Sequence, residues 1–306
     1  MPLELTAFGD IYYARQTHDR HGFFIGSLEL DIALNLVPFV SAFGAIAYDP
    51  KAEVMRLSSF TVDNRLWGNG EHALFQSSVI ESSGVVLGKF DVPFGIAYLH
   101  YSSPDNRLVT QPAIIAATHR AWNDVGAQAY VSTALFDVLG YVVNGSSLPL
   151  TETGTIEAAA GGRLGLNPFG KAVCNCALEL GGSAARSFGQ AGSQLTLLGL
   201  DVSAQAGNVD LQSELIHLRH DRGDRVLGFY SQGVYLIDPV FFGGRYAVTS
   251  QRDEVIERTA TGVLGLEIFP RGELRVAYER GFEARSEMLL FQIAGGTSWK
   301  PTGLRR

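Results

Sequence analysis

The feature that most constrains this chain is an alternation of apolar and polar residues with a period of two, which recurs along nearly its whole length. Residues 27–36 read S-L-E-L-D-I-A-L-N-L. In a strand, side chains two residues apart lie on the same face. The apolar residues from Leu28 to Leu36 therefore share one face, whereas Glu29 and Asp31 share the other. Long strands of this kind, separated by tight turns and charged loops, predict a closed barrel with lipid outside and water inside.

Composition narrows the alternatives. The 306 residues include 24 Lys+Arg and 31 Asp+Glu, for a formal net charge of -7. This acidic balance argues against a nucleic-acid partner, because binding to phosphates needs a concentrated basic face. No run approaches the roughly 18 consecutive apolar residues of a membrane helix. We therefore expect an all-β protein, with residues 1–306 forming a single domain.

Sixteen strand-like segments can be laid end to end, and an even number returns both termini to the same side of a barrel. Connections alternate in character. Tight turns occur at 37–38, 206–208 and 270–272, whereas connections on the opposite side, such as 144–154, are polar and mostly longer. Residues 67–84 are expected to form a long connection of irregular structure. The pattern predicts a closed antiparallel transmembrane β-barrel of about 16 strands, with short periplasmic turns and longer extracellular loops.

Few residues combine in patterns typical of catalysis or metal binding. Cys174 and Cys176 share a face with neighbouring leucines, so we interpret them as small apolar residues, with metal ligation or a redox pair as the alternative. Two H-x-x-H pairs, at 18–21 and 217–220, lie in or beside charged loops and are interpreted as exposed histidines. No H-E-x-x-H, G-x-S-x-G or phosphate-binding glycine loop occurs. We predict no catalytic site, no cofactor and no metal, and a membrane-embedded hydrolase ranks well below a channel.

The stretch 92–124 is the longest irregular segment and the best candidate for a constriction. Sixteen strands enclose a wide lumen, and a loop of this length is usually functional or disordered. We expect it to fold into the lumen, with an exterior lid as the alternative, and Arg107 and Arg120 to contact an anionic solute. Charges of both signs on the lumen face predict modest ion selectivity at most. The candidate channel-lining and constriction residues are Lys89, Asp91, His100, Arg107, His119, Arg120, Glu29, Asp31, Glu157, Arg163, Glu179, Arg245, Arg275 and Glu279.

Three motifs carry a resemblance to a known family. Residues 84–95 read G-V-V-L-G-K-F-D-V-P-F-G, residues 122–130 read W-N-D-V-G-A-Q-A-Y, and residues 141–145 read Y-V-V-N-G. Their order and spacing resemble outer-membrane porins of the phosphate-selective O/P type and related proteobacterial channels. There, a G-[KR]-F-x-x-P-F strand end leads into a long extracellular loop. The chain departs from that pattern at its end, where Trp299 is followed by seven further residues, and in its basic residues, which are interspersed with carboxylates.

The resemblance implies an outer-membrane porin of a Gram-negative bacterium. Such a porin passes small hydrophilic solutes, anions among them, by passive diffusion. It implies outer-membrane lipid and lipopolysaccharide as partners and a homotrimer as a common assembly. Residues 1–10 lack the basic start and apolar stretch of a signal peptide, so an exported protein would be numbered here from its mature chain. The alternative is a non-channel all-β protein: a plugged or adhesive barrel, or a soluble β module. Aromatic residues near strand ends, such as Phe23 and Trp299, favour the lipid-bound barrel.

Overall fold

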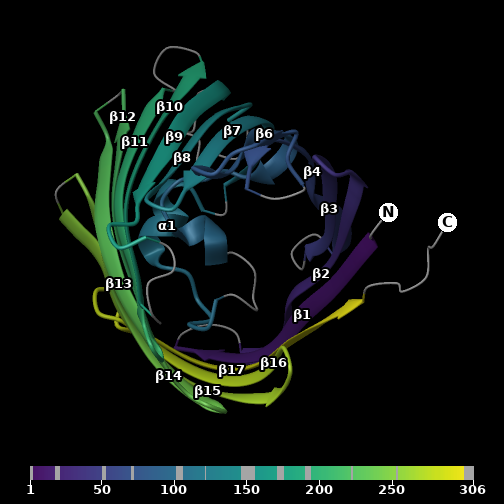
Figure 1. The fold of residues 1–306 in the computed structure, drawn as a ribbon. Coiled ribbons are helices and arrows are strands. Elements are labelled where there is room, and N and C mark those ends of the chain that lie inside the picture. The colour runs from purple at the N-terminus through teal and green to yellow at the C-terminus, as the bar shows by residue number, and fades with distance from the viewer. Residues whose placement is uncertain are drawn as a thin grey trace.

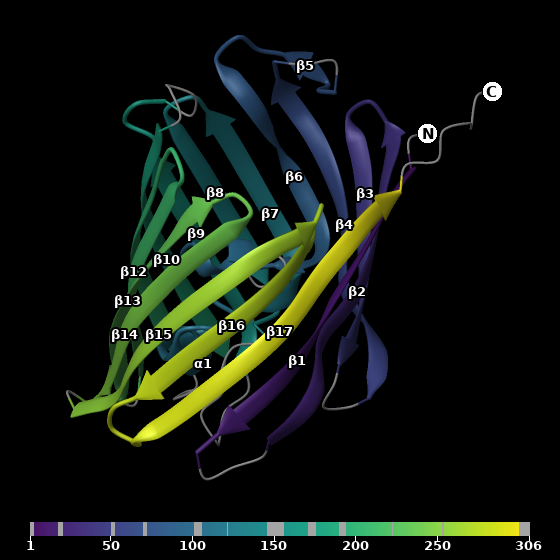
Figure 2. The same cartoon turned by 90° about the horizontal axis from the view of Figure 1, so that it is seen from below.

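Sixteen strands of the computed structural model form one closed antiparallel barrel, as the alternation predicts (Figures 1 and 2). The barrel closes where the first strand, β1, pairs with the last, β17. The structure describes residues 3–17, 21–49, 53–69, 72–100, 106–120, 122–145, 156–170, 176–189, 194–221, 223–252 and 254–299. Cys174 and the side chain of His100 lie outside the described part of the chain. Among the described residues, no helix is long and apolar enough to cross a membrane.

Each barrel strand pairs with its neighbours in chain order. The strands are β1 (Leu3–Gln16), β2 (His21–Val37), β3 (Val40–Asp49), β4 (Val54–Gly68), β6 (Ile80–Asp91), β7 (Asn123–Thr133), β8 (Phe136–Val143), β9 (Ile156–Leu166), β10 (Cys176–Gly189), β11 (Leu195–Ala206), β12 (Val209–His220), β13 (Arg225–Ile237), β14 (Val240–Gln251), β15 (Glu254–Phe269), β16 (Gly272–Gly281) and β17 (Ser286–Trp299). The short strand β5 (Phe75–Gln76) pairs in parallel with the end of β4.

One expected connection is shorter than the sequence suggested. β4 continues to Gly68 and β6 already begins at Ile80, so the connection between them spans 69–79 rather than 67–84. The reason is that Ser82 and Ser83 continue the ladder between β4 and β7. Ser83, for example, pairs with Trp67 on one side and with Val131 on the other. Backbone pairing on both sides outweighs the weak strand propensity of this serine-rich stretch.

The two faces of the barrel differ as the alternation requires. Leu28 and Leu30 on β2 are 49% and 39% exposed, and no part of the chain that the structure describes covers them. Polar residues such as Asp10 and Asp201 lie on the inner face and are buried. A closed barrel satisfies its backbone hydrogen bonds internally, and an apolar outer face can then be solvated by lipid. The chain therefore folds as a membrane-spanning β-barrel.

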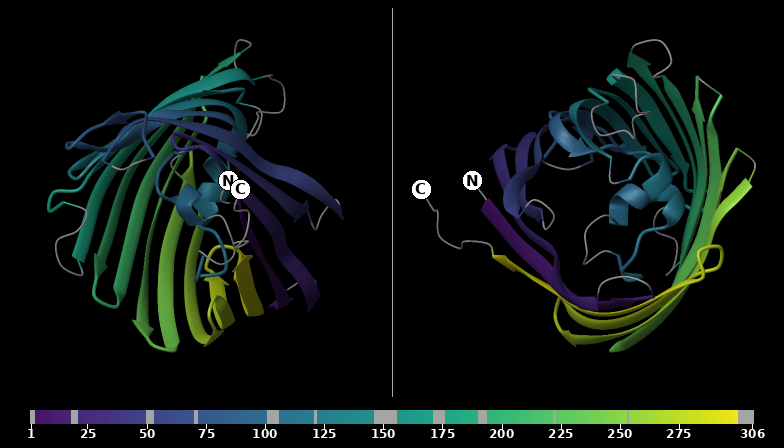
Figure 3. Two further views of the ribbon diagram at one scale, coloured as in Figure 1. Left: turned by 45° about the vertical axis from the view of Figure 1, so that its right-hand side comes forward. Right: turned by 180° about the vertical axis from the view of Figure 1, so that it is seen from behind.

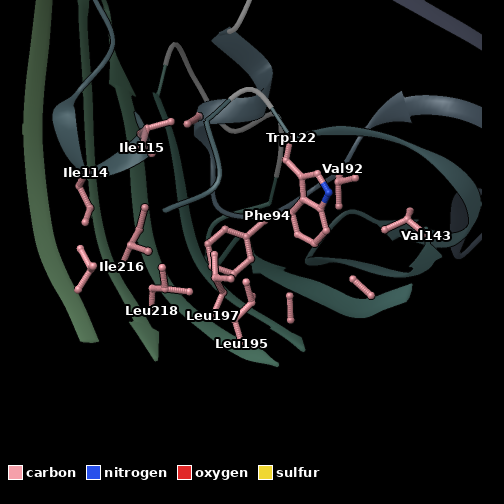
Figure 4. Close-up of a cluster of buried hydrophobic side chains, with 14 of the residues drawn as sticks. Val92, Phe94, Ile114, Ile115, Trp122, Val143, Leu195, Leu197, Ile216 and Leu218 are labelled. Atoms are coloured by element: carbon pink, nitrogen blue, oxygen red, sulfur yellow. The ribbon is translucent and has the colours of Figure 1, made fainter. Parts of the chain in front are cut away.

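The largest apolar cluster lies inside the barrel. It joins the connection between β6 and β7 to inner-face residues of β8–β14, among them Leu197 and Ile216, which are fully buried (Figure 4). That connection contains the 3-10 helix η1 (Ala97–His100) and the helix α1 (Ala113–Thr118). We call its described residues between 92 and 122 the inner loop. We call the end of the barrel from which it starts the loop side, and the opposite end the turn side.

Candidate functional site

The inner loop lies within the barrel, against one part of its wall. Figures 1 and 3 show α1 inside the ring of strands, on the side formed by the middle strands. Contacts of α1 with β12, β13 and β14 place it against the inner face there. Because the loop leaves β6 and returns to β7, it reaches those strands only by crossing the interior. The interior of this part of the barrel is therefore shaped by loop side chains as well as by the wall.

Apolar packing holds the inner loop to the wall. Phe94, Ile114 and Trp122 are fully buried, and they pack with leucines and isoleucines of β11 and β12 (Figure 4). Two inner-face glycines make room for them. A β-carbon on Gly228 would lie 2.8 Å from Ile114 Cδ1, and one on Gly199 would lie 3.1 Å from Phe94 Cζ. Burial of side chains this large stabilises the docked loop by about 1.5–3 kcal/mol each.

Polar contacts fix the start of the inner loop. Gly95 has a φ of +64°, a conformation that glycine adopts without steric cost. Its backbone N–H donates to Ser183 Oγ at 3.0 Å. The carboxylate of Glu214 lies against the same glycine, in the space that a β-carbon would fill. Tyr230 in turn donates its hydroxyl proton to Glu214 Oε2 at 2.9 Å. The backbone can approach Glu214 this closely because residue 95 has no side chain.

A buried arginine holds the middle of the inner loop. Arg245 on β14 donates through Nη1 to the Thr110 carbonyl oxygen at 2.6 Å, and its side chain is 1% exposed. Its second nitrogen pairs with Glu279 Oε2 at 3.2 Å. Thr110 and Thr261 both donate their hydroxyl protons to that same carboxylate oxygen. The charge of Arg245 is therefore taken up by the loop carbonyl and by Glu279.

A second arginine holds the adjoining segment. Arg275 on β16 donates to the Asn106 carbonyl oxygen at 2.9 Å and pairs with Glu273 Oε2 at 2.7 Å. Arg107 of the loop contacts the other oxygen of Glu273 at 3.2 Å and Glu267 Oε1 at 2.7 Å. Its guanidinium also lies 4.9 Å from the ring centroid of Phe241. Arg107, one of the two residues expected to contact an anion, is thus one third exposed and shared between two glutamates.

A third ion-pair cluster lies on the inner faces of β9, β10 and β11. Arg163 forms ion pairs with Glu179 at 2.6 Å and with Asp201 at 2.5 Å. The side chains of Arg163 and Asp201 are both buried. Tyr98 of η1 is close enough to Arg163 and Asp201 for their charges to affect it, and burial raises the pKa of its hydroxyl. Buried ion pairs of this kind cost desolvation energy and rely on good geometry to offset it.

The remaining loop residues predicted for the site lie in different environments. Arg120 follows α1, is exposed, and donates through Nε to the Ala116 carbonyl oxygen at 3.4 Å. His119 is completely buried, and its ring packs edge-on against Phe94 with centroids 5.1 Å apart. Burial in this apolar setting lowers the pKa of His119 to about 3, so the ring is neutral at physiological pH. Arg120 is therefore accessible to solvent, whereas His119 is not.

Of the two residues predicted near the base of the loop, Lys89 does not line the lumen as expected. Lys89 lies in a cross-strand row with Phe60 and Val125, two exposed apolar residues, which places it on the outer face. Its Nζ donates to the Leu57 carbonyl oxygen at 2.8 Å. Asp91 is exposed at the end of β6 and accepts a hydrogen bond from Asn123 at 2.8 Å.

Other predicted residues lie on the wall away from the inner loop. Glu29 and Asp31 lie on the inner face of β2, opposite to the exposed leucines, and are partly exposed. Glu157 is exposed at the start of β9, beside a β-bulge in the pairing with β10. Cys176, at the first residue of β10, is a free and exposed thiol.

Sequence reasoning missed the apolar part of the site. Alternation alone assigns polar residues to the inner face, yet Leu195, Leu197, Ile216 and Leu218 point inward and are buried beneath the loop. A signal for this was present. Residues 195–198 read L-T-L-L, and the loop itself carries isoleucines and a tryptophan that water would solvate poorly. An apolar loop predicts an apolar patch on the wall that receives it.

No protein-family model matches the chain, and no curated protein sequence matches it. Solved structures do match. An anion-selective porin from Comamonas acidovorans is 15% identical, with a TM-score of 0.66 over 97% of this chain and 99% of that one. The fold is porin-type. Pseudomonas putida OprB is 12% identical, with a TM-score of 0.65 over 97% of this chain and 94% of that one.

OmpT of Vibrio cholerae, described in a trimer form, is 11% identical, with a TM-score of 0.61 over 97% of this chain and 99% of that one. These outer-membrane proteins share the architecture of the present chain almost end to end. At such low identities the likeness concerns the fold alone. It supports a porin-type barrel and does not distinguish the phosphate-selective O/P type from other porins.

Proposed function

We propose that this chain is a porin in the outer membrane of a Gram-negative bacterium and that small hydrophilic solutes pass through its water-filled lumen by passive diffusion. The observation that carries the proposal is the contrast between the two faces of the wall. The outer face bears exposed leucines such as Leu28 and Leu200, whereas the inner face bears ionised and amide side chains such as Arg163, Asp201 and Gln292. A polar lumen stays hydrated, and a hydrated lumen conducts solutes.

The distribution of exposure inside the barrel supports a passage beside the inner loop. Inner-face residues of β11–β14, such as Gln212 and Arg245, are buried beneath the loop. On β2 and β4 the inner-face residues Glu29, Asp31 and Asp63 keep part of their surface accessible to water. We place the solute path between the inner loop and the wall formed by β1–β4. The loop then narrows the lumen without closing it.

We further propose that ion selectivity is modest. A strongly phosphate-selective pore needs positive charges that face the passage, because fixed charges near the narrowest point set selectivity. Three of the inner-face arginines (Arg163, Arg245 and Arg275) are instead paired with carboxylates. Arg120 makes no ion pair with any described residue, and Arg107 keeps a third of its surface exposed. These two remain the candidates for contact with an anionic solute.

Reversal potentials in planar bilayers under a salt gradient test both points. Arg107→Ala and Arg120→Ala should each shift permeability toward cations, and Arg107→Ala should shift it more, since it uncovers Glu267 and Glu273. Arg258→Ala is the matched control, because Arg258 lies on the outer face and pairs with Glu283. A chain that inserts into bilayers but never conducts would exclude the channel and favour a plugged barrel. Unchanged potentials in both loop variants would remove the loop from selectivity.

For the assembly we propose a homotrimer. Its support is the similar fold of OmpT of Vibrio cholerae, which is described in a trimer form. Native mass spectrometry of the detergent-solubilised protein should give three times the mass of the chain, and conductance should then appear in steps of three. A monomer at every detergent concentration would exclude the trimer and leave the channel untouched.

A further inference from the structure

Buried hydrogen bonds link side chains on the inner face across the closure of the barrel. They begin on β2, where Ser27 donates its hydroxyl proton to Asp10 Oδ1 on β1 at 2.5 Å. The other oxygen of Asp10 accepts from Gln292 Nε2 on β17 at 2.7 Å. β1 and β17 lie side by side at this closure (Figure 2). Asp10 and Gln292 are each 5% exposed, so the contact between the first and last strands is protected from water.

The same hydrogen bonds continue to the inner loop. Gln292 stands opposite Arg275 in the ladder between β17 and β16, and its Oε1 accepts from Arg275 Nη1 at 3.1 Å. That Nη1 also donates to the Asn106 carbonyl oxygen. The Nε and Nη2 groups of Arg275 contact Glu273 Oε2. Because the guanidinium is planar and rigid, contacts on two sides fix the direction in which Nη1 meets the loop. We call Ser27, Asp10, Gln292 and Arg275 the seam network.

A glycine makes room for the carboxylate of the seam network. The ladder pairs Asp10 with Ser27 and Ile11 with Ile25, so Gly26 is the extra residue of a β-bulge. A β-carbon on Gly26 would lie 2.1 Å from Asp10 Oδ2. The Asp10 carboxylate therefore occupies the space that any other side chain would fill at residue 26. The absence of a side chain there gives the carboxylate its place beside Ser27.

The two arginines that hold the middle of the inner loop differ in their support. Arg245 contacts Glu279, Thr261 and Thr110, which lie on β15, on β16 or on the loop itself. Arg275 is instead linked through one glutamine to the first strand. Contacts on both sides offset the rotamer entropy that is lost when an arginine is fixed. The support of Arg275 therefore includes a contact that forms only where β1 meets β17.

We propose that Asp10 is a positioning residue for the inner loop: it orients Gln292, and through it the guanidinium of Arg275 that holds the Asn106 carbonyl oxygen. The type of each residue fits this role. A carboxylate only accepts and a guanidinium only donates, so the side chain between them must donate on one side and accept on the other. An amide does both. The proposal concerns the structure of the lumen and goes beyond the proposed conduction of solutes.

Hydrogen–deuterium exchange of the full-length protein in detergent, followed by mass spectrometry, tests the role of Asp10. The readout is the backbone amides of 106–110, where Val109 donates to the Asn106 carbonyl oxygen at 3.1 Å. Asp10→Ala should speed exchange there about 10-fold, as expected for one buried hydrogen bond to a charged group. The amides of α1 should stay as slow as in the wild type, because apolar packing holds that helix.

Two further variants test the transmission through Gln292. Asp10→Asn should restore slow exchange, because its amide can accept from Gln292 and donate to Ser27 Oγ. Gln292→Leu should match Asp10→Ala, and the double variant D10A/Q292L should exchange no faster than either single variant, because both changes interrupt the same link. Additive effects of the two changes would overturn the proposal. So would fast exchange in Asp10→Asn, since the loss would then come from the charge.

Asp63→Ala is the matched control. Asp63 is an inner-face aspartate of β4 that accepts a hydrogen bond from the Tyr130 hydroxyl at 3.1 Å. Its loss should leave exchange at 106–110 unchanged. An equal effect of Asp63→Ala, equal acceleration of α1 in Asp10→Ala, or no acceleration at all would reduce Asp10 to a general stabiliser of the barrel.

Gly26→Ala covers the case in which Asp10→Ala fails to fold. It displaces the Asp10 carboxylate without removing it, and it should also speed exchange at 106–110. Unchanged exchange in a folded Gly26→Ala protein would count against the proposal. Exchange is measured without a current, so a wild-type protein that never conducts would refute the channel and leave the result on Asp10 intact.

Discussion

Replacing His119 by glutamine should make the docking of the inner loop insensitive to mild acid. The imidazole is completely buried, and its Nε2 has no hydrogen-bond partner among the described residues. Thr118 Oγ1 donates to the Ile114 carbonyl oxygen, so it can only accept from His119 Nδ1, 2.9 Å away. The neutral tautomer with a proton on Nδ1 fits this site. A second proton on Nε2 would be buried without compensation.

The size of the effect follows from the pKa. Burial lowers the pKa of His119 from 6.5 to about 3, whereas a detached loop would regain the ordinary value. A depressed folded-state pKa means that docking is fully stable above pH 6.5 and weakens as the pH falls toward 3. Each pH unit in that window costs about 1.36 kcal/mol. At pH 4.5 the docked loop therefore loses about 2.7 kcal/mol, a factor of about 100 in the population of detached loops.

Single-channel recordings at pH 7.5 and pH 4.5 measure this directly. The wild type should show frequent conductance fluctuations at pH 4.5 that are rare at pH 7.5. His119→Gln keeps a donor toward Thr118 but cannot take up a proton, so its recordings should change far less. His72→Gln removes an exposed histidine and should behave as the wild type. If His119→Gln fluctuated in acid as much as the wild type, carboxylate titration elsewhere would be the cause and the reasoning on His119 would fail.

Three further predictions concern the loop and the wall. Gly95→Ala places a methyl group where the Glu214 carboxylate lies and requires a strained φ at residue 95. The loop should then detach more often, so single-channel conductance should become larger and noisier. A trace like that of the wild type would show that the contact between Gly95 and Glu214 does not hold the loop. Trp122→Ala should lower the free energy of unfolding in urea by about 3–5 kcal/mol, whereas Trp67→Ala, at a residue 42% exposed, should cost much less; equal costs would contradict the buried packing. Leu200→Arg on the outer face should lower the free energy of unfolding from lipid vesicles by about 2–4 kcal/mol if residue 200 lies at the bilayer midplane. Gln205→Arg on the inner face should leave the free energy of unfolding nearly unchanged. The reverse order would mean that the lipid-facing and lumen-facing sides of β11 are exchanged.

Much of the fold was readable from local pattern. The alternation at 27–36 predicts which face of β2 meets lipid, and Leu28 and Leu30 are indeed exposed. The number of strands and the sides of the tight turns followed from the same period. This works because the pleat of a strand places every second side chain on one face, and because a bilayer leaves a closed barrel as the only way for strands to cross it.

The candidate site was only partly readable. The pattern pointed to Arg163, Arg245 and Arg275 as inner-face residues, and they are, but which carboxylate or carbonyl each would meet depends on neighbouring strands and on the loop. Register between strands far apart in the chain decides those partners. Lys89 shows the limit most clearly, because one residue's difference in alternation moves a side chain from the lumen to the outer face.

The sequence by itself predicted strands with one apolar face, and favoured a closed barrel over a soluble β module, because a period of two leaves an apolar surface that either lipid or a second sheet must cover. Only the tertiary structure decided what fills the interior. Phe94 packs at Gly199 and Ile114 packs at Gly228, each more than 100 residues further along the chain, and His119 is neutral because the surrounding packing excludes water from it. Contacts over such separations are set by the closure of the barrel, which no local pattern encodes.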